Sequence, residues 1–411
     1  MPESNSTVAP RRAALVFIFV TVVLDMLAVG MIIPVLPKLV ALFLGNDLGR
    51  AAQIYGLFGT IWAMMQFFFS PLLGALSDRL GRRPVILVSN FGLGLDYVLM
   101  AMAPTLSWLF VGRVISGITA ASIPTAFAYI ADVTPAEKRA GAFGMVGAAF
   151  GLGFVLGPAL GGVLGNIDPR LPFWVAAGLS LANALYGLLV LPESLPKERR
   201  ANFEWRKANP VGSLKLLRSH PELFGLAAVT FLGGLAHEVL PSVSVLYAGY
   251  RYNWNERDVG FMLAGVGVCA AVVQGGLLQP IVRRFGERRA LLAGLLFGAA
   301  GFAIYGLAGT GAVFWIGVPV MSLWGMSGAA SQGLMTRRVQ PSEQGQLQGA
   351  NSSLRGIAGM FGPGLFTLTF AGSIGSWSNW NLPGAAFLLA ALLLVLAMFV
   401  AWRVTRPSSP A

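Results

Sequence analysis

The chain alternates between long apolar stretches and short polar segments. Twelve apolar stretches of helical length fall at about 13–36, 54–76, 85–103, 107–130, 141–164, 172–191, 222–247, 258–281, 290–308, 312–335, 346–371 and 382–402. At about 1.5 Å rise per residue, a helix of this length crosses a hydrocarbon core of roughly 30 Å. The pattern predicts an all-α membrane protein with twelve transmembrane helices.

Composition agrees with this fold class and excludes several kinds of site. The chain is 55% hydrophobic and 11% charged, whereas an average soluble domain carries about 25% charged residues. It has a single cysteine, Cys269, and two histidines. Because these are too few for a disulfide framework or a Cys/His metal cluster, we expect no metal site.

Positive charges are distributed unevenly along the chain. An even number of spans places both termini on one side of the membrane, and the segments on that side hold 22 of the 29 Lys and Arg residues. Since cytoplasmic loops are enriched in Lys and Arg, both termini are predicted to be cytoplasmic. The net charge of +12 then reflects topology in a lipid bilayer and does not indicate nucleic acid as a partner.

The two halves of the chain repeat with an offset of 205 residues. "RLGRR" at 79–83 matches "RFGER" at 284–288, "LFVG" at 109–112 matches "FWIG" at 314–317, and Gly157-Pro158 matches Gly362-Pro363. Such a duplication is typical of transporters built from two pseudo-symmetric halves around a central site.

The repeat predicts three parts. They are an N-terminal six-helix bundle at 1–191, a cytoplasmic linker at 192–221 and a C-terminal six-helix bundle at 222–411. Within the linker, "NPVGSLKLLR" is either an amphipathic turn or helix on the membrane surface or part of a solvated connection.

One hairpin combines glycines and charges in a specific order. The segment "GALSDRLGRRPV" contains Gly74, Asp78, Arg79, Gly81, Arg82 and Arg83. It resembles the signature hairpin of the major facilitator superfamily, in which the acidic residue is associated with gating. Asp132, in "YIADVTPAEKRAGAFG", is expected to belong to the same gating motif.

Further stretches resemble one branch of that superfamily. "LFVGRVISGITAA", "LDYVLMAMAPTLSWLFVGR", "LLVLPES", "FGERRALL" and "GQLQG" are similar to the tetracycline-efflux branch of drug and proton antiporters. The resemblance covers nearly the whole chain and implies a major facilitator fold. It implies a monomer in a bacterial inner membrane that exports a hydrophobic drug in exchange for protons, with the proton gradient as the driving force and no cofactor.

Two other classes of function are weighed against this one. A facilitator or proton-coupled transporter of an endogenous metabolite on the same fold stays open, because a fold does not determine the substrate. An enzyme is not expected, since the chain has no Walker loop, GxSxG or HExxH motif.

Glycines recur every four residues in the fifth span. "GFVLGPALGG" contains Gly153, Gly157, Pro158, Gly161 and Gly162, and it resembles the antiporter motif of drug exporters. Three of these glycines form a smooth face on which another helix can pack closely. Ordinary tight packing explains the same composition, so both interpretations stay open.

The first span carries a charge near its middle. Asp25 is the only charged residue between Ala13 and Leu36, where an ionised carboxylate costs roughly 2.5–3.5 kcal/mol. It is either a proton-carrying group or a structural acid of the bundle. Burial favours its neutral form and a nearby Arg113 would favour its charged form, so its protonation would depend on conformation. The resembled branch has an essential Asp in this span.

Other polar residues of the first half match the same branch. Asp25, Asp96 and Arg113 are the predicted proton-coupling residues, and Asp25, Gln66 and Arg113 are predicted to bind substrate. The alternatives are a supporting role for Asp96 and a purely structural hydrogen bond for Gln66.

The second half supplies further candidates and two departures. His237 and Glu238 are predicted to line the cavity and to relay protons or bind a cation, with structural pairing as the alternative. The additional predicted substrate-binding residues are His237, Gln274 and Arg355. The His and Asp of the tetracycline branch fall on Ala270 and Gly298. These departures argue against the metal chelate of tetracycline as substrate and in favour of a related hydrophobic drug.

Overall fold

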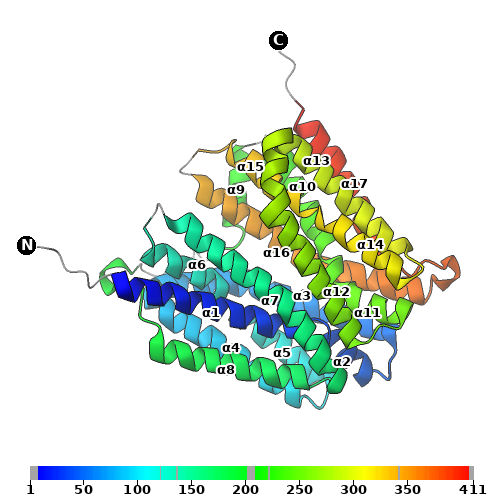
Figure 1. Ribbon diagram of the computed structural model, residues 1–411, viewed down its shortest axis with the longest axis horizontal. Coiled ribbons are helices and arrows are strands. Elements are labelled where there is room, and N and C mark those ends of the chain that lie inside the picture. Colours follow the sequence, from blue (N-terminus) through cyan, green and yellow to red (C-terminus); the bar gives the residue numbers. More distant parts are fainter. Residues whose placement is uncertain are drawn as a thin grey trace, which may run out of the picture. The chain divides into compact units, whose positions relative to one another are not determined.

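The computed structural model describes residues 8–120, 122–135, 138–200, 209–220, 223–340 and 343–406. Within these ranges every regular element is a helix, as Figure 1 shows. This confirms the all-α prediction. The first eight helices are α1 (Val8–Ile32), α2 (Leu36–Phe43), α3 (Leu48–Leu80), α4 (Arg82–Met102), α5 (Leu106–Thr119), α6 (Ser122–Val133), α7 (Arg139–Ile167) and α8 (Leu171–Val190).

The later part of the chain has the same character. Its α-helices are α9 (Lys215–Ser219), α10 (Phe224–His237), α11 (Val239–Tyr252), α12 (Glu256–Val272), α13 (Leu278–Leu307), α14 (Gly311–Ser322), α15 (Gly325–Thr336), α16 (Gln344–Ile374) and α17 (Ala385–Val404). Short helical turns are η3 (Lys197–Arg199), η4 (Gly212–Leu214), the π-helical η6 (Val273–Leu277) and η8 (Ser378–Trp380).

The helices pack as two units. Unit 1 comprises the described residues of 1–36 and 65–209, and unit 2 those of 37–64 and 210–411. α3 therefore begins in unit 2 and ends in unit 1. The two units are defined by which helices pack together, whereas the predicted halves are defined by the repeat in the sequence. The two divisions therefore differ for residues 37–64.

Unit 1 is organised around α1. This helix packs on α7 and α8, and α4 packs on α8 and α5 (Figure 1). Buried side chains that include Phe17, Ile86, Tyr129 and Val146 form one apolar cluster. The cluster joins α1, α4, α6 and α7.

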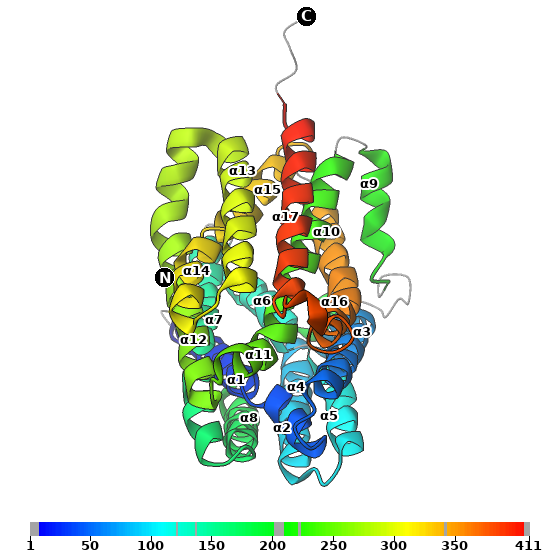
Figure 2. The same ribbon diagram turned by 90° about the vertical axis from the view of Figure 1, so that its right-hand side faces the viewer.

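Aromatic rings form much of the core of unit 2. α17 lies between α13 and α10 (Figure 2). The rings of Tyr305 and Phe314 stack with centroids 4.1 Å apart, and the Tyr247 hydroxyl donates to the Tyr305 carbonyl at 2.9 Å. These contacts hold α11, α13 and α14 together.

Four of the predicted spans contain a break in the regular helix. The spans predicted at 13–36, 107–130, 222–247 and 312–335 correspond to the pairs α1/α2, α5/α6, α10/α11 and α14/α15. Each pair is one candidate membrane span, so the break lies within the span and leaves the number of spans unchanged. A proline ring removes a backbone donor and collides with the carbonyl four residues before it. Pro37 and Pro124 stand four residues, and Pro241 three residues, after the first non-helical residue of an interruption.

The interruptions preserve the internal repeat. Residue 33 follows α1 and residue 238 separates α10 from α11, so these two breaks are 205 residues apart, the offset found in the sequence. The breaks in the α5/α6 and α14/α15 pairs also lie close to this offset. The duplication is therefore expressed in helix geometry as well as in sequence.

The eighth and ninth predicted spans form one long helical run. Residues Glu256–Leu307 are 52 residues of helix with a non-helical Gly286 (φ 80°), a conformation that glycine adopts easily. A run of this length can cross a bilayer twice. In the part of the chain that the structure describes, eleven helical stretches are long and apolar enough to span a membrane, and this run is one of them.

The linker is partly helical. Residues of "NPVGSLKLLR" form η4 and α9, which both pack on α16, and Leu216 is buried. Residues 212–219 are thus helical, whereas a position of this segment on the membrane surface stays a prediction. Residues 201–208 of the linker lie outside the described ranges.

Candidate functional site

Asp25 lies in a buried polar cluster of unit 1. Its side chain on α1 is 2% exposed. The Asn183 amide on α8 donates from Nδ2 to Asp25 Oδ1 at 3.1 Å and to the Thr21 carbonyl at 3.3 Å. The Thr21 hydroxyl donates to Asn183 Oδ1 at 3.1 Å. The first-span carboxylate is therefore bound to a residue of the sixth span, which the sequence did not predict.

The other predicted acid and base of unit 1 belong to the same electrostatic neighbourhood. The phenol of Tyr97 on α4 interacts electrostatically with Asp25, Asp96 and Arg113. Arg113, on α5, also interacts with Asp96. The structure thus brings together the three predicted proton-coupling residues of the first half.

Asp96 is packed tightly against α5. It is 1% exposed, and a Cβ added to Gly112 would lie 2.6 Å from its Oδ1. Among the described residues neither of its carboxyl oxygens has a hydrogen-bond partner. Gln66, the remaining candidate of the first half, is half-buried on α3.

Two candidates of the second half lie at the break between α10 and α11. Glu238 is the single residue between these helices, and a Cβ added to Gly362 of α16 would overlap its Cβ and Cγ. The ring of His237 lies 5.9 Å from that of Trp324, between centroids. Trp324 stands at the break between α14 and α15. The two breaks of unit 2 are therefore joined by side-chain contact.

Arg355 and Gln274 lie near the same two breaks. The aliphatic stem of Arg355 is 3.7 Å from the position of a Cβ added to Gly234 on α10. Gln274, in the π-helical η6, has its Cγ 3.8 Å from the position of a Cβ added to Gly325, the first residue of α15. All four second-half candidates thus belong to the neighbourhood of the α10/α11 and α14/α15 breaks in unit 2.

Gly298 stands where the resembled tetracycline branch has an Asp, and its surroundings leave little space for a side chain. It is buried on α13, and an added Cβ would lie 2.7 Å from Trp324 Cγ and 2.7 Å from Leu394 Cδ1. The indole of Trp324 therefore occupies the space that an acidic side chain would need at position 298. Ala270 is half-buried on α12.

The gating hairpin forms a network of charges. Gly81 has φ 111° and connects α3 to α4. Arg82 is ion-paired with Asp78 and, through Nε, with Asp132 Oδ2 at 3.1 Å. Arg83 donates to the Leu188 carbonyl at 2.6 Å. Arg82 also donates to the Ser77 hydroxyl, which donates to the Gly74 carbonyl at 2.8 Å. Arg79 is exposed.

Glu193 completes the network and was missed as a separate candidate. Its Oε1 accepts from the backbone N–H of Arg82 at 2.9 Å, and its Oε2 accepts from that of Arg83 at 3.3 Å. A carboxylate at this place bonds two otherwise unpaired N–H groups at the start of α4. The signal for Glu193 in the sequence is the segment "LLVLPES", which resembles the tetracycline-efflux branch.

The glycines of the fifth span pack on the first. A Cβ added to Gly157 would lie 2.8 Å from the Gly30 Cα, and Cβ atoms added to Gly153 or Gly161 would overlap Met26 or Met31. Gly162 is buried. Pro158 lies inside α7 without ending it. The predicted smooth face is therefore the surface against which α1 packs.

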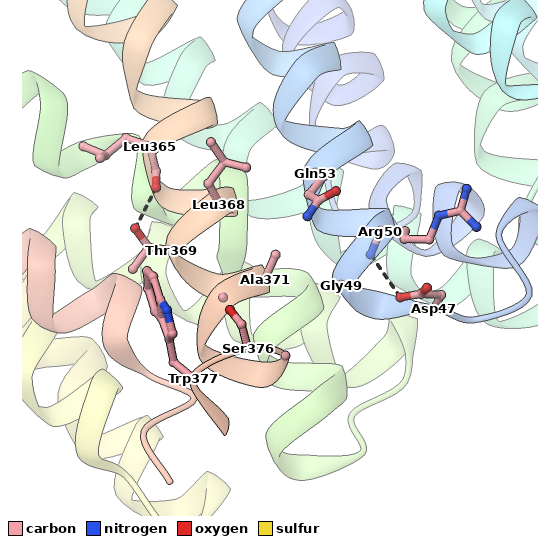
Figure 3. Close-up of a pocket in the computed structure, with 12 residues that line it drawn as sticks. Asp47, Gly49, Arg50, Gln53, Leu365, Leu368, Thr369, Ala371, Ser376 and Trp377 are labelled. Atoms are coloured by element: carbon pink, nitrogen blue, oxygen red, sulfur yellow. Dashed lines mark hydrogen bonds between the residues drawn. The ribbon is translucent and has the colours of Figure 1, made fainter. Parts of the chain in front are cut away.

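An open groove lies apart from these clusters. Figure 3 shows it between α3 and α16 in unit 2, with Gln53, Leu365, Leu368 and Trp377 among its lining residues. None of the predicted site residues lines it.

The amino-acid sequence was compared with those of known proteins. Residues 18–363 match the Major Facilitator Superfamily. The class C tetracycline resistance protein of Escherichia coli is 38% identical over 381 residues, which cover 92% of this chain and 95% of that protein. The class B protein of Escherichia coli is 36% identical over 383 residues, covering 91% and 93%.

Solved transporter structures share the fold. The human organic anion transporter MFSD10 superposes with a TM-score of 0.70 at 24% identity, covering 95% of this chain and 99% of that one. A bacterial homologue of the human lysosomal transporter Spinster gives 0.78 at 17% identity, covering 98% and 99%. The chain is a multi-pass membrane transporter of small molecules and not an enzyme, and it belongs to the Major Facilitator Superfamily, in the branch of the tetracycline resistance proteins.

Proposed function

We propose that the protein exports a hydrophobic compound from the cytoplasm in exchange for protons, across a bacterial inner membrane with both termini in the cytoplasm. The observation that carries this proposal is the buried Asp25, which lies with Asp96 and Arg113 around Tyr97. A carboxylate inside a transmembrane bundle is energetically costly, so such residues commonly belong to a proton or substrate pathway. The relatives named for tetracycline resistance support export of a drug.

In this mechanism the proton acts on the substrate indirectly. Because Asp25 is 2% exposed, we assign it the proton and assign contacts with the compound to other residues. Protonation removes one negative charge from the cluster, which changes the electrostatic environment of Arg113 and Asp96. Because α1 packs through its glycine contacts on α7, a change at Asp25 can alter how these helices fit. The proton gradient drives the cycle and no cofactor is involved.

The substrate proposal is a planar or amphipathic hydrophobic compound. Gln66, Arg113, His237, Gln274 and Arg355 are the proposed contacts, and the rings of His237 and Trp324 offer an aromatic surface. His237 and Glu238 are proposed as second-half groups that exchange protons. Since Trp324 fills the space beside Gly298, the metal chelate of tetracycline is not the proposed substrate.

A susceptibility panel tests this proposal. The chain is expressed in an efflux-deficient bacterial host, and minimal inhibitory concentrations are measured for tetracycline and for a set of hydrophobic antibiotics and dyes. We expect the wild-type chain to raise the minimal inhibitory concentration of at least one hydrophobic compound. The Asp25→Asn variant should not raise it, and the Asp168→Asn variant should raise it as the wild type does. Asp168 is an exposed control whose Oδ1 accepts from the Arg170 N–H, a bond that asparagine can also make. No rise for any compound would favour the alternative, a facilitator of an endogenous metabolite.

A further inference from the structure

Asn183 is fully buried and forms all of its described hydrogen bonds with α1. Its exposed fraction is 0%, and its partners Thr21 and Asp25 are 1% and 2% exposed. An amide buried in a transmembrane bundle is costly unless it is hydrogen-bonded. Here the amide makes three bonds to two residues that are one helical turn apart.

These bonds determine which way the amide points. Oδ1 accepts from the Thr21 hydroxyl, while Nδ2 donates to the Thr21 carbonyl and to Asp25 Oδ1. If the amide were turned by 180°, its oxygen would face the Thr21 carbonyl and the Asp25 carboxyl oxygen, neither of which can donate when Asp25 is ionised. Thr21 therefore holds Asn183 as a donor toward Asp25.

We propose that Asn183 is a positioning residue for proton exchange at Asp25. The inference rests on the proposed proton-coupled export. Because Oδ1 accepts an N–H, it remains an acceptor in both states of the acid. The exchanged proton bonds to Oδ2 when the carboxylate is neutralised, and the same Oδ2–H bond breaks when the proton leaves. Asn183 thereby selects the oxygen that reacts and stabilises the charged form through an N–H donor.

Other titratable and charged groups surround this hydrogen bond. The titratable groups that act in the same region are Tyr97 and Asp96 on α4 and Arg113 on α5. On the helices that pack against α1, the described titratable side chains of α6 lie at its end, where Tyr129 bonds the Pro192 carbonyl and Asp132 bonds Arg82. α7 presents Gly153 to Met26, the neighbour of Asp25. Asn183 is therefore the group whose hydrogen bond to one oxygen of Asp25 can be tested by substitution.

The test compares Asn183→Ala, Asn183→Ser and Thr21→Val with a matched control, Ser180→Ala. Ser180 lies on the same helix and is 1% exposed. Purified full-length protein in lipid nanodiscs is titrated by infrared spectroscopy, with the carboxyl band of Asp25 identified as the signal lost in Asp25→Asn. The pH profile of drug uptake into vesicles is measured in parallel.

We expect Asn183→Ala to move the titration midpoint of Asp25 to higher pH. Loss of the N–H donor destabilises the carboxylate, so the acid keeps its proton to higher pH, by about one pH unit or a tenfold change in proton affinity. Asn183→Ser, which retains a smaller donor, should move it less, Thr21→Val should shift it in the same direction, and Ser180→Ala should leave it in place.

Two kinds of failure are distinguishable. If Asn183→Ala is folded and its midpoint equals that of the wild type, the positioning role is wrong, even when transport falls uniformly at every pH. If the infrared midpoint moves as expected but uptake never depends on Asp25, the positioning role stands and the proposed function fails. Should Asn183→Ala not fold, the titration midpoints of Asn183→Ser and Thr21→Val decide the outcome. A wild-type midpoint in both variants would contradict the positioning role.

Discussion

At the scale of residues, the protein stabilises an acid in the middle of α1 by surrounding it with matched polar groups. Asp25 accepts from Asn183, which is itself held by Thr21. Asp96, by contrast, interacts electrostatically with Arg113 and has no hydrogen-bond partner among the described residues. The buried carboxyl groups of Asp25 and Asp96 therefore have different environments, and only that of Asp25 contains a described hydrogen-bond donor. This difference makes Asp25 the better candidate for a group that is charged during part of a transport cycle.

Restoring the branch's acid at position 298 should harm the protein. In Gly298→Asp the new Cβ would lie 2.7 Å from Trp324 Cγ and from Leu394 Cδ1. Overpacking of this kind destabilises by about 1–3 kcal/mol, and burial of a carboxyl group adds to it. We expect a lower thermal unfolding temperature in detergent and no gain in tetracycline resistance.

The control for this variant is Gly309→Asp, because Gly309 is exposed and has open space around it. Its unfolding temperature should stay close to that of the wild type. The double variant Gly298→Asp with Trp324→Leu, which has a smaller side chain beside the new acid, should recover part of the loss. A Gly298→Asp protein as stable as the wild type would contradict the account of Trp324 as the occupant of this space.

The sequence predicted the charged members of the site better than the neutral ones. Asp25, Asp96 and Arg113 stand out because charges are rare in apolar spans. Asn183 gives no such signal: it is a small polar residue in "SLANALYG", and its contact with Asp25 joins residues 158 positions apart. The sequence drew attention to Glu193 only through the resemblance of "LLVLPES". Its bonds at the start of α4 join residues far apart in the chain, and hydrophobic patterning does not predict such a contact.

At the scale of helices, the interruptions are the main feature that hydrophobic periodicity could not predict. The four broken spans are apolar on both sides of the break, so their patterns read as continuous. Prolines alone would not have identified them, since Pro71, Pro158, Pro319 and Pro363 all lie inside helices that continue past them. The helix type, the approximate positions and the repeat were predictable, because each depends on apolar length or on sequence identity between halves.

The contact between α1 and α7 gives a prediction at this scale. Gly157→Leu would place a side chain where the Gly30 Cα lies 2.8 Å from the added Cβ. A backbone atom cannot move aside as a flexible side chain can, so we expect the helices to separate, with a loss of about 1–3 kcal/mol or more and a marked fall in transport. Thermal unfolding and resistance assays measure the two effects.

The matched control on the same helix is Gly147→Leu, since nothing lies within 4 Å of an added Cβ at Gly147. That variant should unfold close to the wild-type temperature and should still transport. If the two leucine variants behave alike, close packing of α1 on α7 is not what the glycines of the fifth span provide.

At the scale of the whole molecule, the proposed topology follows from the distribution of charge. It places the loop between α16 and α17 outside the cell and the linker around η3 inside. In a Cys269→Ala background, Asn379→Cys should react with a membrane-impermeant maleimide in intact cells, whereas Glu198→Cys should react only after permeabilisation. Both positions are exposed. Labelling of Glu198→Cys in intact cells would contradict the cytoplasmic assignment of the linker and the termini.

In the proposed cycle the whole molecule has to couple the movement of the proton at the buried Asp25 to the movement of the compound. Proton release driven by the drug is therefore the most direct evidence of the exchange. The central measurement uses purified protein in liposomes that enclose a pH-sensitive dye, with no imposed gradient, and adds to the outside a compound for which the protein gives resistance. The account predicts a change in internal pH that requires the compound, is absent in Asp25→Asn and persists in Asp168→Asn. Accumulation of the compound with no proton movement in the wild type, or equal proton movement in Asp25→Asn, would contradict it.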